Sequence, residues 1–144
     1  MPLVVDAPVA LAWALPDEIS AYADAVLAVV EQEGLRVPEL WAREIANGLA
    51  VAYRRKRIAS ADEKVFLAAL SRLRIDAEDG SPLTVVRDGT AAAMRYGLTA
   101  YDAAYVDLAL REKLVLATLD GPMRKAAERS GVTIFRPHEP APAQ

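Results

Sequence analysis

Four carboxylates in this 144-residue chain occupy places where a charged side chain is unusual. Asp6 directly follows the apolar run LVV, and Asp120 directly follows LVLATL. Glu44 is spaced from its apolar neighbours so that it falls inside the apolar stripe of a predicted helix, and Asp102 lies near the start of another. An ionised carboxylate in apolar surroundings is costly unless it is hydrogen-bonded, paired or bound to a metal. These four residues are therefore candidates for a functional site.

The same four carboxylates are expected to converge. Asp6 and Asp120 both emerge where a buried strand ends, and ligands of parallel sheets bind at the carboxyl ends of the strands. No histidine or lysine joins the group, and two like charges about 4 Å apart repel by about 4 kcal/mol at an effective dielectric of 20. A divalent cation removes this conflict, and oxygen-only ligation is what Mg²⁺ or Mn²⁺ prefers.

Each carboxylate also has a purely structural interpretation. Aspartate is a favoured residue at helix N-termini, so Asp6 and Asp120 could be N-caps, and Asp102 could complete a capping box with Thr99. Glu44 could pair with a nearby arginine or extend to solvent. Taken singly, the residues leave these alternatives open, and it is the expected convergence that favours a metal site.

Strand-like and helix-like patterns alternate along the chain and must position these residues. The predicted strands are residues 2–5, 35–38, 72–76, 114–119 and 132–135. The predicted helices are residues 8–15, 18–33, 39–57, 61–73, 83–96, 100–111 and 121–130. Ser60 is expected to cap the fourth helix, with Glu63 completing a capping box. The alternation predicts an α/β fold, a three-layer α/β/α sandwich around a short, mostly parallel sheet.

Composition excludes several classes of protein. The net charge of −3 and the isoelectric point near 5.2 mean that any nucleic acid must be held by a local basic patch or through metal. The chain has no cysteine, and its one histidine, His138, lies in a Pro-rich tail, which argues against a Ser-His-Asp triad or a histidine zinc site. There is no signal-peptide pattern and no apolar run that could cross a membrane, so we expect a cytoplasmic protein.

Motifs of three other classes are missing. No Gly-x-x-x-x-Gly-Lys-Ser/Thr loop is present for a nucleotide. A haloacid-dehalogenase-type phosphatase would need a second aspartate where Pro8 stands. A receiver domain would need an acidic doublet beside its first strand and a lysine after a late strand, and neither is present.

Four segments, LVVDAPVALAWALPDE, VPELWAREIANGLAVAYRRKRI, GLTAYDAAYVDLALREKLVLATLD and AAERSGVTIF, resemble the successive motifs of PIN-domain proteins. Within these, the chain resembles the VapC-like ribonuclease toxins of prokaryotic toxin–antitoxin operons. The resemblance implies a PIN-like nuclease domain over residues 1–135, and the Pro-rich composition of residues 136–144 predicts a flexible C-terminal tail. It implies that Asp6, Glu44, Asp102 and Asp120 bind Mg²⁺ or Mn²⁺.

Two further positions bear on that resemblance. Thr118 matches the hydroxyl residue before the last acid, which often steadies a water bound to the metal. Pro8 departs from the family, which commonly has Ser or Thr there, so one hydroxyl near the metal is lost but no ligand.

The implied activity is metal-dependent endoribonucleolytic cleavage of RNA by an activated water. The resemblance further implies a homodimer and a cognate antitoxin whose C-terminal segment covers the crevice. The alternative is a non-catalytic PIN-like binding or scaffold module, against which the complete set of four acids argues.

Several other residues are candidates for supporting roles. Asn47 lies three residues after Glu44 on nearly the same helix face and could hydrogen-bond to it. The basic run Arg54, Arg55, Lys56 and Arg57 could bind flanking RNA phosphates or only complement the helix dipole. Asp107 is expected to be solvated or near the site. The aromatic residues expected in the core or at a dimer interface are Trp13, Trp41, Tyr101 and Tyr105.

Overall fold

Four short parallel strands form one sheet in the order β3-β2-β1-β4 in this computed structural model, which describes residues 1–137. The strands are β1 (Leu3–Val5), β2 (Leu35–Val37), β3 (Ile75–Ala77) and β4 (Leu116–Ala117). β1 pairs with β2 on one side and with β4 on the other. All three residues of β1 are apolar and buried, as expected for a strand that is covered on both faces.

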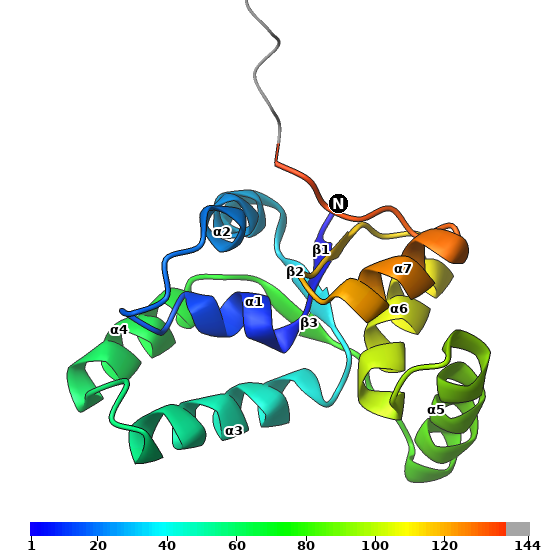
Figure 1. Cartoon of the computed structure of the whole chain (residues 1–144), viewed down its shortest axis with the longest axis horizontal. Helices are drawn as coiled ribbons and strands as arrows, with labels where there is room; N and C mark the ends of the chain where they lie inside the picture. The colour runs from blue at the N-terminus through cyan, green and yellow to red at the C-terminus, as the bar shows by residue number, and fades with distance from the viewer. Residues whose placement is uncertain (138–144) are drawn as a thin grey trace, which may run out of the picture.

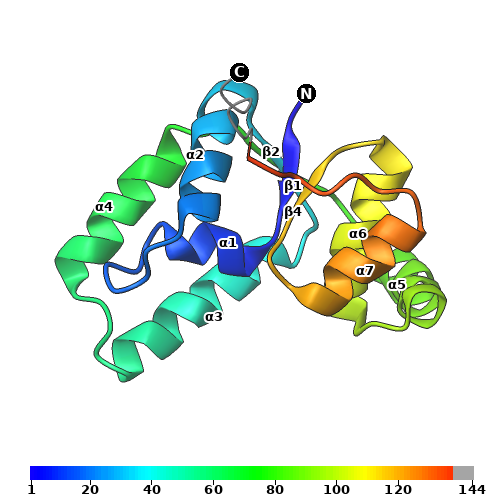
Figure 2. The ribbon, with the colours of Figure 1, turned by 45° about the horizontal axis from the view of Figure 1, so that its top comes forward.

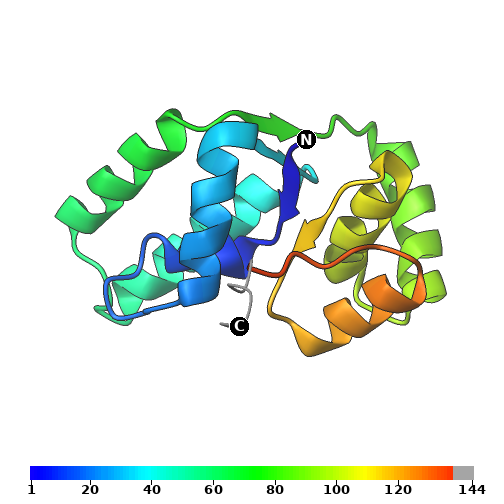
Figure 3. The same ribbon diagram turned by 90° about the horizontal axis from the view of Figure 1, so that it is seen from above.

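Seven helices in the described part of the chain cover the sheet from two sides (Figures 1 and 2). On one side lie α1 (Ala7–Ala12), α2 (Ala21–Glu33), α3 (Trp41–Arg54) and α4 (Ser60–Ser71). On the other lie α5 (Pro82–Tyr96), α6 (Ala100–Glu112) and α7 (Gly121–Arg129). The predicted three-layer α/β/α sandwich is confirmed, and Figure 3 shows that β1 runs directly into α1.

The predicted last strand, residues 132–135, is wrong in extent. Only Ile134 makes a bridge, parallel to Leu116. Leu116 receives a hydrogen bond from the Phe135 N–H at 2.8 Å and donates its own N–H to the Thr133 carbonyl at 2.9 Å. These two bonds are the backbone hydrogen bonds that β4 makes with residues 132–135.

Several predicted helix boundaries are also corrected. α1 and α2 are shorter than expected, since Pro16 lies between them and Ser20 caps α2 by accepting the Ala23 N–H at 3.0 Å. α4 begins at Ser60, one residue earlier than predicted, so that Ala59 and not Ser60 stands at the N-cap. The acid that accepts the N-cap N–H is accordingly Asp62, at 2.8 Å, and not Glu63.

No helix within residues 1–137 is long and apolar enough to span a bilayer. Of the predicted tail, Arg136 lies within the described part and pairs with Glu128 at 3.2 Å. Residues 138–144, which include His138, lie outside the described residues.

Candidate metal centre

Asp6 is buried between the end of β1 and the start of α1, with only 1% of its surface exposed. It caps α1, because its Oδ1 accepts the Val9 N–H at 3.0 Å. Its Oδ2 accepts the Thr118 hydroxyl at 2.5 Å. The structural interpretation of Asp6 as an N-cap is therefore correct, but a cap does not require burial of the charge.

Asp120 is tied to Asp6 through Thr118. Thr118 is fully buried, and its Oγ1, which donates to Asp6, also accepts the Asp120 N–H at 3.1 Å. Asp120 caps α7 through Oδ1, which accepts the Met123 N–H at 2.8 Å. Its other carboxylate oxygen has no hydrogen bond from residues 1–137, and the side chain is open to solvent.

Glu44 lies in the first turn of α3, and its Oε1 accepts the hydroxyl of Tyr105 on α6 at 2.5 Å. Within residues 1–137 it makes no ion pair, so the proposed pairing with an arginine is not seen. Asp102 lies in the first turn of α6, where its N–H donates to the Thr99 hydroxyl at 3.1 Å. No described residue donates a hydrogen bond to the Asp102 carboxylate, so only half of the expected capping box forms.

The charges of these four carboxylates act on one another. Burial, aided by the charges of Asp120 and Glu44 and opposed by the hydrogen bonds from Thr118 and Val9, raises the pKa of Asp6 to about 6. Burial, aided by the charge of Asp102, raises the pKa of Glu44, although the Tyr105 hydroxyl opposes this. Burial and the charge of Asp120 raise the pKa of Asp102. The charges of Asp120 and Glu44 therefore act on Asp6, that of Asp102 acts on Glu44, and that of Asp120 acts on Asp102, which links the four acids of the predicted set in one group.

The donor set fits a hydrated hard cation. It consists of carboxylate oxygens, and within residues 1–137 none of the four carboxylates forms an ion pair with a lysine or arginine. Within residues 1–137, no three acidic or histidine side chains lie close enough together to coordinate one metal ion directly. Mg²⁺ usually keeps several water molecules and takes only one or two carboxylates directly, so spaced carboxylates suit it.

The sequence of residues 3–129, which is most of the chain, matches the family model of the PIN domain. The chain belongs to the PIN-domain family. This PIN domain is 36% identical over 129 residues to Ribonuclease VapC3 from Pyrobaculum aerophilum, a match that covers 90% of this chain and 95% of the relative.

Two solved structures share the fold of this PIN domain. The crystal structure of PAE2754 from Pyrobaculum aerophilum has a TM-score of 0.66 and 26% identity, and the match covers 89% of this chain and 87% of that one. The crystal structure of FitAcB from Neisseria gonorrhoeae has a TM-score of 0.61 and 19% identity, with 94% and 97% covered. The second likeness shows the fold alone.

A cavity of about 240 Å³ opens beside two of the four carboxylates of the PIN domain. Asp6 and Asp120 line it together with Glu18 and Ser20, which precede α2. Pro8 also lines it, so the position where the family commonly carries a hydroxyl presents an apolar ring here. This cavity is a space next to the acids into which part of a substrate could enter.

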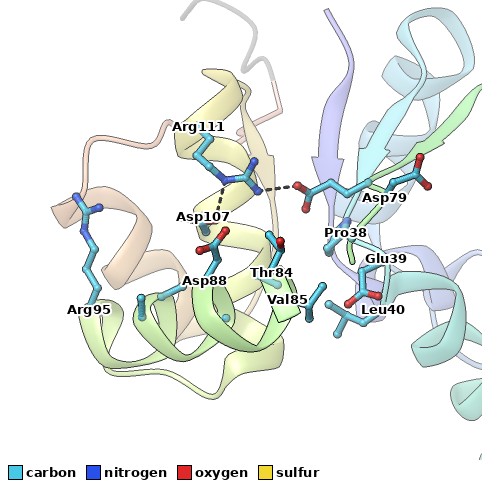
Figure 4. A pocket seen from close by; sticks show the side chains of 16 residues that line it. Pro38, Glu39, Leu40, Asp79, Thr84, Val85, Asp88, Arg95, Asp107 and Arg111 are labelled. Carbon is cyan, nitrogen blue, oxygen red and sulfur yellow. Dashed lines mark hydrogen bonds and ion pairs between the residues drawn. The ribbon is translucent and has the colours of Figure 1, made fainter. Parts of the chain in front are cut away.

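A larger cavity of about 450 Å³ lies between α5, α6 and the segments that follow β2 and β3 (Figure 4). None of the four carboxylates lines it. Asp107 does, and it pairs with Arg111 at 2.7 Å, while Arg111 also pairs with Glu78 at 2.7 Å. Asp107 is therefore accounted for as the partner of an arginine.

The remaining candidate residues, Asn47 and the basic run Arg54, Arg55, Lys56 and Arg57, form no hydrogen bond or ion pair with the four carboxylates within residues 1–137. Asn47 is exposed, and the hydrogen bond to Glu44 comes from Tyr105 instead. Of the basic run, Arg57 is held by Asp17 at 3.1 Å and by Glu18 at 3.7 Å. The other three members are exposed at the far end of α3 and form no ion pair within residues 1–137.

Tyr105 contacts Glu44, a contact that the sequence did not predict. It was expected in the core or at an interface, and it is indeed buried, with 1% of its surface exposed. Its hydroxyl nevertheless contacts a candidate ligand. The available signal was its position three residues after Asp102, which places both side chains on one side of α6.

Proposed function

We propose that this PIN domain is a metal-dependent endoribonuclease and the toxin of a toxin–antitoxin pair. In this proposal the four carboxylates of Asp6, Glu44, Asp102 and Asp120 hold Mg²⁺ or Mn²⁺. The observation that carries it is that four acids come from four separate segments with no cationic partner within residues 1–137, and that burial and neighbouring carboxylate charges raise the pKa of Asp6, Glu44 and Asp102. The name of the relative, Ribonuclease VapC3, supports RNA as the substrate.

A divalent cation held there supplies positive charge that acidifies a water molecule and offsets the charge of the phosphodiester. Asp6 would contribute a carboxylate whose two oxygens are oriented by separate hydrogen bonds, Oδ1 by the Val9 N–H and Oδ2 by the Thr118 hydroxyl. Asp120 keeps one oxygen free of hydrogen bonds from the described residues, and so does Glu44. In this proposal these two groups accept a proton from the attacking water, since the described residues include no histidine.

RNA must approach an acidic site on a protein whose net charge is −3. We therefore propose that exposed lysine and arginine side chains bind the RNA phosphates that flank the cleaved bond. Arg54, Arg55 and Lys56 meet this requirement, whereas Arg57 is already paired with Asp17 and Glu18. α3 separates them from Glu44 by about ten residues, or about 15 Å at 1.5 Å per residue. They can therefore bind flanking nucleotides but not the scissile phosphate.

Two protein partners belong to the same proposal. A cognate antitoxin would cover the acidic site, in line with the VapC relative. A homodimer is supported by an apolar stripe on α5, where Leu83, Val86 and Met94 are 75%, 65% and 80% exposed. A two-fold interface brings the same patch of both copies together, so this stripe would pack against its own copy.

RNA cleavage by chelator-treated full-length protein, with Mn²⁺ or Mg²⁺ added back, tests the function. We expect cleavage by the wild type only with metal, and loss of cleavage in Asp102→Asn and Asp120→Asn. Asp79→Asn is the matched control, because Asp79 is an exposed acid that lines the larger cavity away from the four carboxylates. A wild type that binds RNA but never cleaves it would favour the non-catalytic binding module.

A further inference from the structure

A buried hydroxyl holds one of the four carboxylates. Tyr105 is 1% exposed, and its hydroxyl donates to Glu44 Oε1 at 2.5 Å. Glu44 itself is only half-buried, and its Oε2 accepts no hydrogen bond from residues 1–137. One oxygen of this carboxylate is therefore fixed from inside the protein, and the other remains open.

This hydrogen bond joins the two helices that carry Glu44 and Asp102. Glu44 belongs to the first turn of α3, and Asp102 to the first turn of α6. Tyr105 lies three residues after Asp102, which places the two side chains on the same side of α6. One face of α6 thus presents a carboxylate of its own and a hydroxyl that holds the carboxylate of a neighbouring helix.

We propose that Tyr105 is a positioning residue that aims the Glu44 carboxylate at the metal. The proposal rests on the function proposed above. A glutamate side chain has several rotatable bonds, and holding it in place before the ion arrives removes part of the entropy cost of binding. Groups that orient ligand residues in this way typically contribute 10- to 100-fold in metal affinity.

A purely structural role for Tyr105 makes a different prediction. A buried tyrosine hydroxyl usually needs a partner, and Glu44 could simply be that partner. Removing the hydroxyl would then change stability but not metal affinity. Tyr96 provides a matched control, because it is also buried, at 5% exposure, and its hydroxyl has no hydrogen-bond partner in the described part of the chain.

The test measures the dissociation constant of Mn²⁺ alone, without RNA, by the electron paramagnetic resonance signal of free Mn²⁺. Full-length wild type, Tyr105→Phe, Tyr96→Phe, Glu44→Ala and the double variant Glu44→Ala/Tyr105→Phe are compared, with Asp120→Asn as the reference for the site. We expect Tyr105→Phe to bind Mn²⁺ 10- to 100-fold more weakly and Tyr96→Phe to bind as the wild type does. Because Tyr105 acts through Glu44, the double variant should bind no more weakly than Glu44→Ala. Excess Mn²⁺ should restore RNA cleavage by Tyr105→Phe.

The outcomes separate this inference from the proposed function. If Asp120→Asn weakens Mn²⁺ binding and Tyr105→Phe binds within twofold of the wild type, the positioning role is wrong and the metal site stands. If neither variant affects Mn²⁺ binding, the proposed site itself is wrong. Should Tyr105→Phe fail to fold, proton NMR of the wild type decides the matter. The hydroxyl resonance of Tyr105 should then shift on addition of Mg²⁺, and a resonance that Mg²⁺ leaves unchanged contradicts the proposal.

Discussion

Replacing Asp6 by asparagine should stabilise the metal-free protein at neutral pH and do so much less in acid. Burial raises the pKa of Asp6 from 3.8 to about 6 in the folded protein. A carboxyl group whose pKa is higher in the folded than in the unfolded protein favours folding most at a pH below its unfolded pKa. This contribution to the free energy of unfolding is lost as the pH rises through the pKa of the folded protein. The ionised Asp6 therefore opposes folding above about pH 6, until a cation binds.

The size of the effect follows from the shift. One pKa unit corresponds to about 1.4 kcal/mol, so a shift of about two units costs the wild type about 3 kcal/mol between pH 4 and pH 7.5. Asparagine does not titrate in this range, and its amide oxygen can still accept the Val9 N–H that Asp6 accepts. The cap is thus kept while the charge is removed.

Urea denaturation of both proteins in chelator, at intervals from pH 4 to pH 7.5, measures this difference. The free energy of unfolding of Asp6→Asn minus that of the wild type should increase by about 3 kcal/mol across the range. Asp24→Asn, which changes an exposed acid in the first turn of α2, is the control and should show little dependence on pH. A difference for Asp6→Asn that stays constant with pH would refute the electrostatic reasoning, and an unfolded variant would show that the fold requires the Asp6 carboxylate itself.

Three further predictions concern metal, RNA and helix packing. Mn²⁺ at 100 times its dissociation constant should stabilise the wild type by about 2.7 kcal/mol and Asp120→Asn much less, as melting curves would show; equal shifts would place the ion elsewhere. Changing Arg54, Arg55 and Lys56 together to glutamine should weaken RNA binding. The slope of the logarithm of the binding constant against the logarithm of the salt concentration should flatten by up to about 0.7 per lost phosphate contact, with little change in the cleavage rate at saturating RNA. An unchanged slope would mean that RNA approaches from another face. Gly48→Ala should lower stability, because its Cβ would overlap the side chain of Leu11 where α1 and α3 pack, and Leu11→Ala should relieve the loss; a Gly48→Ala variant as stable as the wild type would contradict this packing.

Much of the fold could be predicted because its signals are local. Asp6 and Asp120 each follow an apolar run, and the alternation of strands and helices then places both at the carboxyl edge of a parallel sheet. Gly97 adopts a positive φ of 64° at the end of α5, which is the conformation that its position as a helix stop predicts. Such features depend on a few neighbouring residues and are visible in the sequence.

The features that could not be predicted depend on contacts between distant segments. Tyr105 and Glu44 are 61 positions apart, and their hydrogen bond exists only because α3 and α6 begin at the same edge of the sheet. Arg57 reaches Asp17 across 40 positions, which removes it from the cations available to RNA. The predicted last strand failed for a similar reason, since pairing requires a contact with β4, a separate segment, and only Ile134 forms a bridge to it.

The central claim is that these four carboxylates hold a divalent cation, and anomalous diffraction from crystals of the full-length protein soaked in Mn²⁺ tests it most directly. We expect an anomalous peak at the carboxyl edge of the sheet, within bonding distance of oxygens from at least two of Asp6, Glu44, Asp102 and Asp120. The peak should be absent in crystals of Asp120→Asn. A peak elsewhere, or none at saturating Mn²⁺, would contradict the account.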